Sequence, residues 1–170
     1  MNENSIFSRL FGSKKTTEGE AITSPVTGTV LPIEEVSDAT FAQKLLGDGL
    51  AIVPGEGKLY APADGTVQGL QKKTGHALCI TTPSGIELLL HIGRDTVKME
   101  GRGFTICCEE GAQVKAGDLL IEFDIDAIKA EGYDTVSPVI VLNTDEYEFE
   151  KAAAGPISHG DTLYTLTKKN

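Results

Sequence analysis

The stretch TGHALCITTPSGIELLLHIGRDTVKMEG, residues 74–101, contains two of the three histidines of the chain, His76 and His91. Two short apolar runs lie between them, ALCIT and IELLLHI, and Pro83-Ser84-Gly85 separates the runs. Apolar runs on either side of a Pro/Ser/Gly cluster predict a β-hairpin. A turn centred on Pro83 and Ser84 pairs position 76 with position 91. The Cβ atoms of the two histidines would then lie roughly 4.5–5.5 Å apart.

This register gives the hairpin two different faces. One face is uniformly apolar and is expected to point into the core; it carries Ala77, Cys79, Ile86, Leu88 and Leu90. The other carries both histidines with Leu78, Ile80, Leu89 and Glu87. A slip of one residue would put the histidines on opposite faces. A few polar groups in an apolar frame are typical of a docking surface.

The whole-chain composition excludes some classes of protein. The 170 residues are 40% hydrophobic with a net charge of −10, which is ordinary for one globular domain but argues against a nucleic-acid partner. No apolar run approaches the roughly 18 residues of a membrane-spanning helix, and no secretory signal is expected. Three cysteines without CxxC spacing indicate structural thiols in a reducing compartment, so we expect a cytoplasmic protein.

The chain divides into a tail and one domain. Residues 1–20 form either a flexible tail or a short basic amphipathic helix with at most peripheral membrane contact. Residues 21–170 alternate strand and turn patterns, and SPVTGTV (24–30) resembles APADGTV (61–67). We therefore predict an all-β fold, an antiparallel sandwich or barrel of short strands. Two short helices are expected, over 39–46 after Asp38 and over 125–131 after Asp124.

The histidine pair has three possible interpretations. The two rings can be a structural feature without a role. A metal site needs further ligands, for which Asp38 or Asp95 are available, but no HxH or HExxH spacing supports it. A phosphoacceptor site needs one imidazole as nucleophile and a second to hold phosphoryl oxygens. Thr74 and the turn after His91 offer oxygens that can hold each ring through Nδ1 and leave Nε2 free.

Several motifs resemble one known family, the glucose-family EIIA component of the bacterial phosphoenolpyruvate-dependent sugar phosphotransferase system. The matching segments are SPVTGTV, FAQKLLGDGLAI, APADGTV, TGHALCI, SGIELLLHIGRDTV, EGRGF, GAQVKAGDLLIEFD and SPVIVLN. They cover roughly residues 21–170, and HIGRDTV with the upstream TGHA is the most specific part. The resemblance implies a cytoplasmic β-sandwich of the duplicated hybrid motif type.

The resemblance also implies a phosphotransferase component with a phosphohistidine intermediate. Its partners would be the histidine-containing phosphocarrier protein as donor and a cysteine of a sugar permease's EIIB domain as acceptor. By position, His91 matches the histidine phosphorylated on Nε2, and His76 the histidine that stabilises the phosphoryl group. Thr74 matches the threonine that orients His76, and the carbonyl of Gly93 matches the group that orients His91.

Six further residues match the family's partner-binding surface. Two are acidic and suit a basic donor, and four form an apolar rim; they are Asp38, Asp95, Phe41, Leu46, Leu89 and Val97. No cofactor is implied and no resident metal, although His76 and His91 are half of a zinc site at a partner interface. Lys72 and Thr40 depart from the expected pattern, and His159 lies outside every motif and is expected to be a surface residue.

Two alternatives remain open at this point. The short β motifs also resemble lipoyl- or biotin-carrying domains, with Lys98 as the modified residue. Val97 departs from the biotinyl motif, which has methionine on both sides of its lysine, and a carrier domain needs only about half of this length. The other alternative is a purely regulatory module that binds enzymes or transporters and has lost the relay. The presence of both histidines argues against that loss, and a regulatory role alongside phosphoryl transfer is compatible with them.

Overall fold

The computed structural model describes residues 19–170. The expected N-terminal tail therefore lies outside the described residues except at its end, where Glu20 opens the first strand, β1 (Glu20–Thr23). No helix within the described part is long and apolar enough to cross a membrane.

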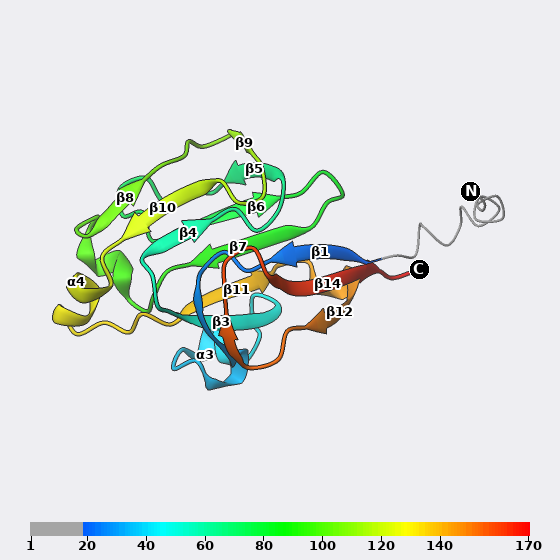
Figure 1. The fold of residues 1–170 in the computed structure, drawn as a ribbon, viewed down its shortest axis with the longest axis horizontal. Helices are drawn as coiled ribbons and strands as arrows, with labels where there is room; N and C mark the ends of the chain where they lie inside the picture. The colour runs from blue at the N-terminus through cyan, green and yellow to red at the C-terminus, as the bar shows by residue number, and fades with distance from the viewer. Residues whose placement is uncertain (1–18) are drawn as a thin grey trace.

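The described chain consists mainly of short strands (Figure 1). After β1 they are β2 (Gly28–Pro32), β3 (Asp48–Pro54), β4 (Lys58–Tyr60), β5 (Gly65–Gln68), β6 (Ala77–Thr81), β7 (Glu87–His91), β8 (Phe104–Ile106), β9 (Gln113–Val114), β10 (Leu119–Phe123), β11 (Ser137–Val141), β12 (Tyr147–Lys151), β13 (Gly155–Ile157) and β14 (Thr162–Lys168). The helices are α3 (Ala39–Ala42) and α4 (Ile125–Ala130), with 3-10 turns η1 (Ile33–Glu35), η2 (Thr96–Met99) and η3 (Thr144–Glu146).

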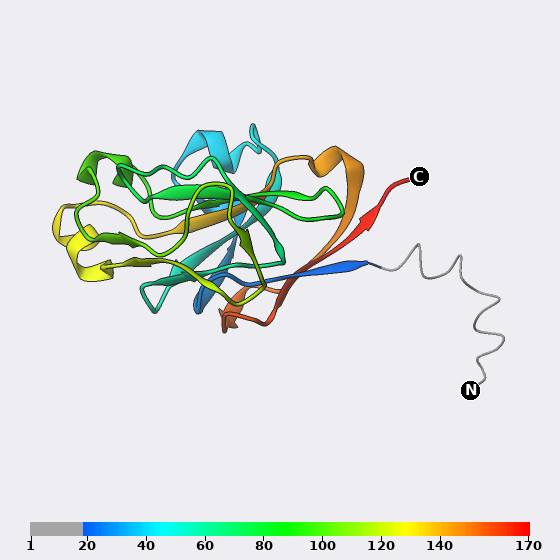
Figure 2. The same cartoon turned by 90° about the horizontal axis from the view of Figure 1, so that it is seen from above.

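All the strand pairs are antiparallel and form three sheets. The largest has eight strands in the order β13-β2-β3-β11-β7-β6-β5-β9, and the smaller sheets are β1-β14-β12 and β4-β10-β8. Seen from above, α3 lies on the outer side of the large sheet, and α4 lies at the end of the molecule opposite the C-terminus (Figure 2). This architecture confirms the predicted antiparallel all-β fold with short helices.

Both helices begin at the expected caps. The carboxylate of Asp38 accepts from Thr40 N, and that of Asp124 accepts from Ala127 N. The expectation that the first helix runs to residue 46 is wrong, because Lys44 adopts a left-handed conformation with φ 59°. Leu45 N then donates to Thr40 O at 3.1 Å and Lys44 N to Phe41 O at 3.0 Å, the hydrogen-bond pattern of a Schellman end.

The hairpin forms as predicted, but its register differs by one residue. His91 lies opposite Ala77 rather than His76. The cause is a three-residue loop in place of the expected two-residue turn: Thr82 N donates to Ile86 O at 2.9 Å, and Gly85 has φ +98°. A type I turn followed by one left-handed residue is a common three-residue hairpin loop, and glycine tolerates that conformation.

The corrected register changes which side chains of β6 face the core. Leu78 and Ile80 are fully buried with Leu88 and Leu90, whereas Cys79 is half-buried on the outer face. The expected faces of β7 are correct, and those of β6 are reversed, as a slip of one residue requires. Burial of the two large aliphatic side chains of β6, Leu78 and Ile80, explains the preference, since each contributes about 1.5–3 kcal/mol when removed from water.

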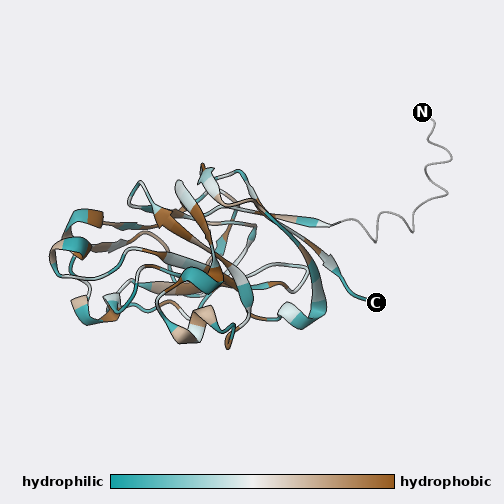
Figure 3. Ribbon diagram, turned by 90° about the horizontal axis from the view of Figure 1, so that it is seen from below, coloured by the Kyte–Doolittle hydropathy of each residue, from teal (hydrophilic) through white to brown (hydrophobic). Residues whose placement is uncertain are grey.

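The buried side chains form two groups. The main core fills the space between the sheets, and a smaller cluster of Ile33, Val36, Phe41, Ala51 and Ile140 lies under η1 and α3. Figure 3 shows hydrophobic segments along the central strands and hydrophilic ones mostly in the peripheral turns. Leu89 and Val136 pack against the smaller cluster and remain only partly buried, so α3 covers only part of the outer face of the sheet.

Candidate functional site

The two histidines meet despite the changed register. Their ring centroids lie 5.1 Å apart, with the ring planes at 83°. His91 is the last residue of β7, and His76 precedes the first residue of β6 at a bend in the backbone. The His76 carbonyl accepts from Ile92 N at 2.7 Å, which ties the two strand ends together. Because His76 lies outside the strand, its side chain does not follow the strand's alternation.

The ring of His91 is held by the turn that follows it. Its Nδ1 lies 2.9 Å from the carbonyl oxygen of Gly93. A carbonyl only accepts hydrogen bonds, so Nδ1 carries the proton and Nε2 keeps its lone pair when the ring is neutral. Gly93 has φ +72°, and a Cβ there would meet Asp134 O at 2.7 Å. The close approach and the left-handed backbone both require glycine at this position.

The ring of His76 is held by a side chain from its own segment. The Oγ1 of Thr74 lies 2.6 Å from Nδ1 of His76. When the hydroxyl donates to Nδ1, the remaining nitrogen Nε2 carries a proton and becomes a donor. The pair then presents one Nε2 acceptor, on His91, beside one Nε2–H donor, on His76. This combination suits the attack of one ring on an electrophile whose oxygen the other ring binds.

Burial keeps both imidazoles neutral at physiological pH. Desolvation, reinforced by the nearby His91, lowers the pKa of His76 to about 4. Desolvation also lowers the pKa of His91, although the hydrogen bond to Gly93 and the charges of Asp38 and Asp95 oppose that shift. Burial disfavours the charged form of a base. A neutral His91 is the nucleophilic form.

Two of the four expected apolar residues lie near His91, and the other two are exposed hydrophobic side chains. The Phe41 ring centroid lies 5.2 Å from that of His91, and Leu89 is half-buried one position further along the outer face of β7. Leu46 is 42% exposed and Val97 47% exposed. Leu45, which sequence reasoning placed inside a helix, is 68% exposed because the chain turns at Lys44. Its position next to Leu46, a predicted partner-binding residue, was the one feature of the sequence that could have indicated its exposure.

The acidic residues lie at the borders of the same site. Asp38 caps α3, and Asp95 precedes η2 in a left-handed conformation with φ 62°. The negative charges of both carboxylates favour a protonated His91 and so raise its pKa, against the effect of burial. Arg94 is also exposed there, with its Nε 3.9 Å from Asp95 Oδ2; it lies within the HIGRDTV segment but was not among the predicted site residues.

The remaining candidates are a metal site, the lysine of a carrier domain and three residues that do not fit the family's pattern. No group of three or more His, Cys, Asp or Glu side chains between residues 19 and 170 is placed to hold a metal ion. Lys98 lies in η2 and is exposed, as are Lys72 and Thr40. His159 stacks on Tyr60 with ring centroids 3.9 Å apart, outside the histidine pair.

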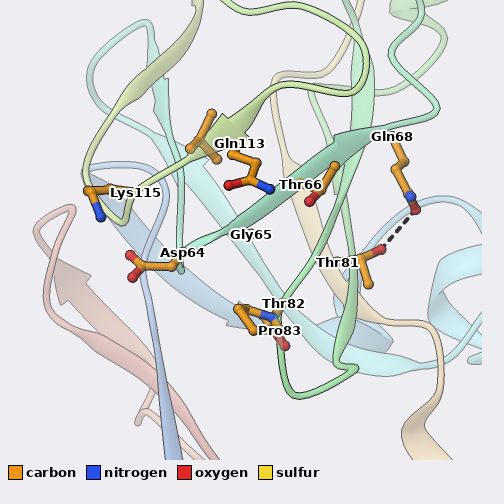
Figure 4. Close-up of a pocket in the computed structure, with 10 residues that line it drawn as sticks. Asp64, Gly65, Thr66, Gln68, Thr81, Thr82, Pro83, Gln113 and Lys115 are labelled. Atoms are coloured by element: carbon orange, nitrogen blue, oxygen red, sulfur yellow. Dashed lines mark hydrogen bonds between the residues drawn. The ribbon is translucent and has the colours of Figure 1, made fainter.

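A pocket of about 470 Å³ opens at the other end of β6 (Figure 4). Thr66, Thr81 and Gln113 line it, and Thr81 donates to Gln68 at 2.9 Å. None of the candidate site residues lines this pocket. The site is therefore assigned from the convergent polar atoms and lowered pKa values of the histidine pair, because polar groups with perturbed pKa values mark functional sites.

Comparisons with known proteins agree on one family. The model of the family described as phosphoenolpyruvate-dependent sugar phosphotransferase system, EIIA 1, matches residues 20–147. A glucose-specific EIIA component from Halalkalibacterium halodurans is 44% identical over 96% of this chain and 98% of its own length. A beta-glucoside-specific EIIBCA component from the same organism is 48% identical over 92% of this chain, which spans only 24% of that longer protein.

A solved structure shows the same fold. The glucose permease IIA from Mycoplasma capricolum matches with a TM-score of 0.83 and 34% identity, over 87% of this chain and 96% of that one. The chain therefore belongs to the EIIA 1 family of the phosphoenolpyruvate-dependent sugar phosphotransferase system, whose EIIA components relay phosphoryl groups in sugar uptake.

Proposed function

We propose that His91 is the phosphoryl acceptor of this chain and that Nε2 is the atom phosphorylated. The observation that carries the proposal is the hydrogen bond from His91 Nδ1 to the Gly93 carbonyl, 2.9 Å long, which leaves Nε2 as the free nucleophile. The donor is the phosphohistidine of the histidine-containing phosphocarrier protein. The acceptor is a cysteine thiolate of an EIIB domain, and the EIIBCA name of one relative supports that partner.

Each transfer exchanges one bond to phosphorus for another. The Nε2 lone pair forms a bond to phosphorus as the nitrogen–phosphorus bond of the donor breaks. The His91 ring gains positive charge and keeps its Nδ1 proton, which the Gly93 carbonyl stabilises. In the second transfer the thiolate attacks phosphorus and His91 leaves as a neutral imidazole. Phosphoryl transfer of this kind depends mainly on positioning and charge stabilisation.

His76 stabilises the phosphoryl group in this mechanism. With Thr74 donating to Nδ1, its Nε2–H donates to a phosphoryl oxygen. The low pKa of His76, about 4, rises once the dianionic group is bound, because a nearby opposite charge favours the protonated ring. A partly charged donor then stabilises the oxygens more strongly than a neutral one.

The surrounding surface receives the two partners. Phe41, Leu46, Leu89 and Val97 exclude water at the interface, which slows hydrolysis of the phosphohistidine between encounters. Asp38 and Asp95 pair with basic residues of the donor and raise its association rate. The apolar rim contributes contact area that both partners can use in turn.

Incubation with the phosphorylated phosphocarrier tests the assignment. We expect the wild-type chain to gain one acid-labile phosphate, detected by intact mass, and His91→Gln to gain none. His159→Gln is the matched control, since it removes a histidine outside the site, and it should accept phosphate at the wild-type rate. Acid-labile phosphate on His91→Gln would refute the assignment.

A further inference from the structure

Two consecutive peptide units after His91 are each held at both ends. The first joins Ile92 to Gly93: its carbonyl accepts from the buried hydroxyl of Thr96, and its N–H donates to Ser137 Oγ at 3.3 Å. The second joins Gly93 to Arg94: its carbonyl accepts from His91 Nδ1, and its N–H donates to Asp134 O at 2.9 Å.

Ser137 occupies a position from which it can act on His91 only through the backbone. It opens β11, whose register pairs Val139 with Leu90, and extending that register by two residues puts Ser137 opposite Ile92. Its side chain is 2% exposed, and its Oγ donates to Thr135 O at 2.9 Å while it accepts from Gly93 N. With its only hydroxyl proton committed to a carbonyl, the oxygen is oriented as an acceptor toward Gly93.

A buried serine hydroxyl that both donates and accepts a hydrogen bond has little rotational freedom. Thr96 is likewise fully buried, so the hydroxyls that fix the first peptide unit are shielded from competing water. Fixing that unit fixes the left-handed Gly93, and Gly93 in turn sets the direction of the carbonyl that accepts the hydrogen bond from His91 Nδ1. Buried polar networks of this kind orient a functional ring when every member is paired.

We propose that Ser137 is a positioning residue for the phosphoacceptor: through the Gly93 peptide it holds His91 in the Nδ1–H tautomer, with Thr96 as its counterpart on the same peptide unit. This inference rests on the proposed function, because it assigns a role in preparing Nε2 for attack. The hydroxyl of Ser137 bonds to the backbone at Gly93 and Thr135 rather than to the His91 ring. It acts by limiting the directions available to one carbonyl.

The test is Ser137→Ala, read out in two ways. Long-range ¹H–¹⁵N spectra of the unphosphorylated protein report the tautomer of His91. The rate of phosphate transfer from the phosphocarrier reports function. We expect His91 to change from one tautomer to a mixture, and the transfer rate to fall about tenfold, the change that corresponds to one lost buried hydrogen bond. Ser137→Thr, which keeps a hydroxyl, should restore both.

The matched control is Ser24→Ala. Ser24 is 1% exposed, and its Oγ donates to Val26 O at 2.7 Å and accepts from Val26 N, so this variant also loses a doubly bonded buried hydroxyl. It should alter stability and leave the His91 tautomer and the transfer rate unchanged. If Ser137→Ala does not fold, Thr96→Val removes the hydroxyl at the other end of the same peptide unit.

The outcomes separate the two proposals. An unchanged His91 tautomer with an unchanged transfer rate in a folded Ser137→Ala protein would overturn the positioning role. The same changes in Ser24→Ala would also overturn it, because they would show a general effect of lost stability. If the wild-type chain accepts no phosphate, the proposed function fails, whereas the tautomer comparison still decides whether Ser137 positions His91.

Discussion

Replacing His76 with glutamine removes a buried imidazole whose ionisation is coupled to folding. The pKa of His76 is about 4 in the folded chain against an ordinary value of 6.5. Below pH 6.5 the unfolded chain binds a proton at this position and the folded chain does not. Stability is therefore greatest above pH 6.5 and falls as the pH decreases toward 4, since the state that binds more protons is favoured by acid.

The size of the effect follows from the shift. A pH of 5 is about 1.5 units below the pKa of the side chain in the unfolded chain, so that side chain is protonated there. The side chain in the folded chain is still mostly neutral at this pH. At about 1.4 kcal/mol per unit, His76 lowers the free energy of unfolding by about 2 kcal/mol at pH 5. His91, whose pKa is also lowered, acts in the same direction. The free energy of unfolding of His76→Gln should therefore depend less steeply on pH than that of the wild type.

Urea unfolding at pH 7, 6 and 5 measures this difference for both proteins. Subtracting the His76→Gln values from the wild-type values cancels groups that titrate alike in both, and the difference should fall by about 2 kcal/mol between pH 7 and pH 5. Histidine ring resonances followed from pH 8 to pH 3 provide a direct check. A constant difference between the two proteins, or a His76 ring that titrates near pH 6.5, would refute the reasoning.

Three further changes test separate parts of the structure. Tyr164→Phe removes a buried hydroxyl that accepts from Leu50 N at 2.5 Å and donates to Val139 O at 2.7 Å. We expect urea unfolding to show a free energy of unfolding that is lower by about 1–3 kcal/mol. An unchanged midpoint would contradict the role of this bridge between β3 and β11. Gly93→Ala places a Cβ 2.7 Å from Asp134 O at φ +72°; thermal unfolding should show a loss of about 1–3 kcal/mol, and wild-type stability would argue against strain at this turn. Val97→Asp changes a side chain that is 47% exposed; calorimetric titration should show weaker binding of the phosphocarrier, with a free energy of unfolding within about 0.5 kcal/mol of the wild type, and unchanged affinity would exclude Val97 from the docking surface.

The hairpin shows how far local sequence reasoning extends. Its two strands and a turn within Pro83-Ser84-Gly85 were predictable, because alternating apolar residues and turn residues act locally. The register depended on whether the loop has two residues or three, and the sequence allows both. Burial of Leu78 and Ile80 with the main core decided between them, and that burial involves residues far apart in the chain.

The contacts of the site are likewise of two kinds, those between neighbours in the sequence and those between distant segments. Thr74 and Gly93 each lie two residues from the histidine they contact, so short-range reasoning could place them. Phe41 reaches His91 from α3, fifty positions earlier in the chain, and Ser137 reaches Gly93 from β11. No periodicity links these segments; packing on the large sheet brings them together. The exposure of Leu45 likewise follows from the left-handed Lys44, whose backbone conformation no residue pattern indicated.

The sequence by itself therefore determined the all-β class, the caps at Asp38 and Asp124, and the two histidines with their nearest oxygens. Each of these depends on residues within a few positions of one another, where backbone geometry limits the choices. Only the tertiary structure decided the register of β6, the burial that lowers the histidine pKa values, and the hydrogen bond that Gly93 N donates to Ser137 at the start of β11. These depend on which surfaces exclude water, and that is a property of the packed sheets as a whole.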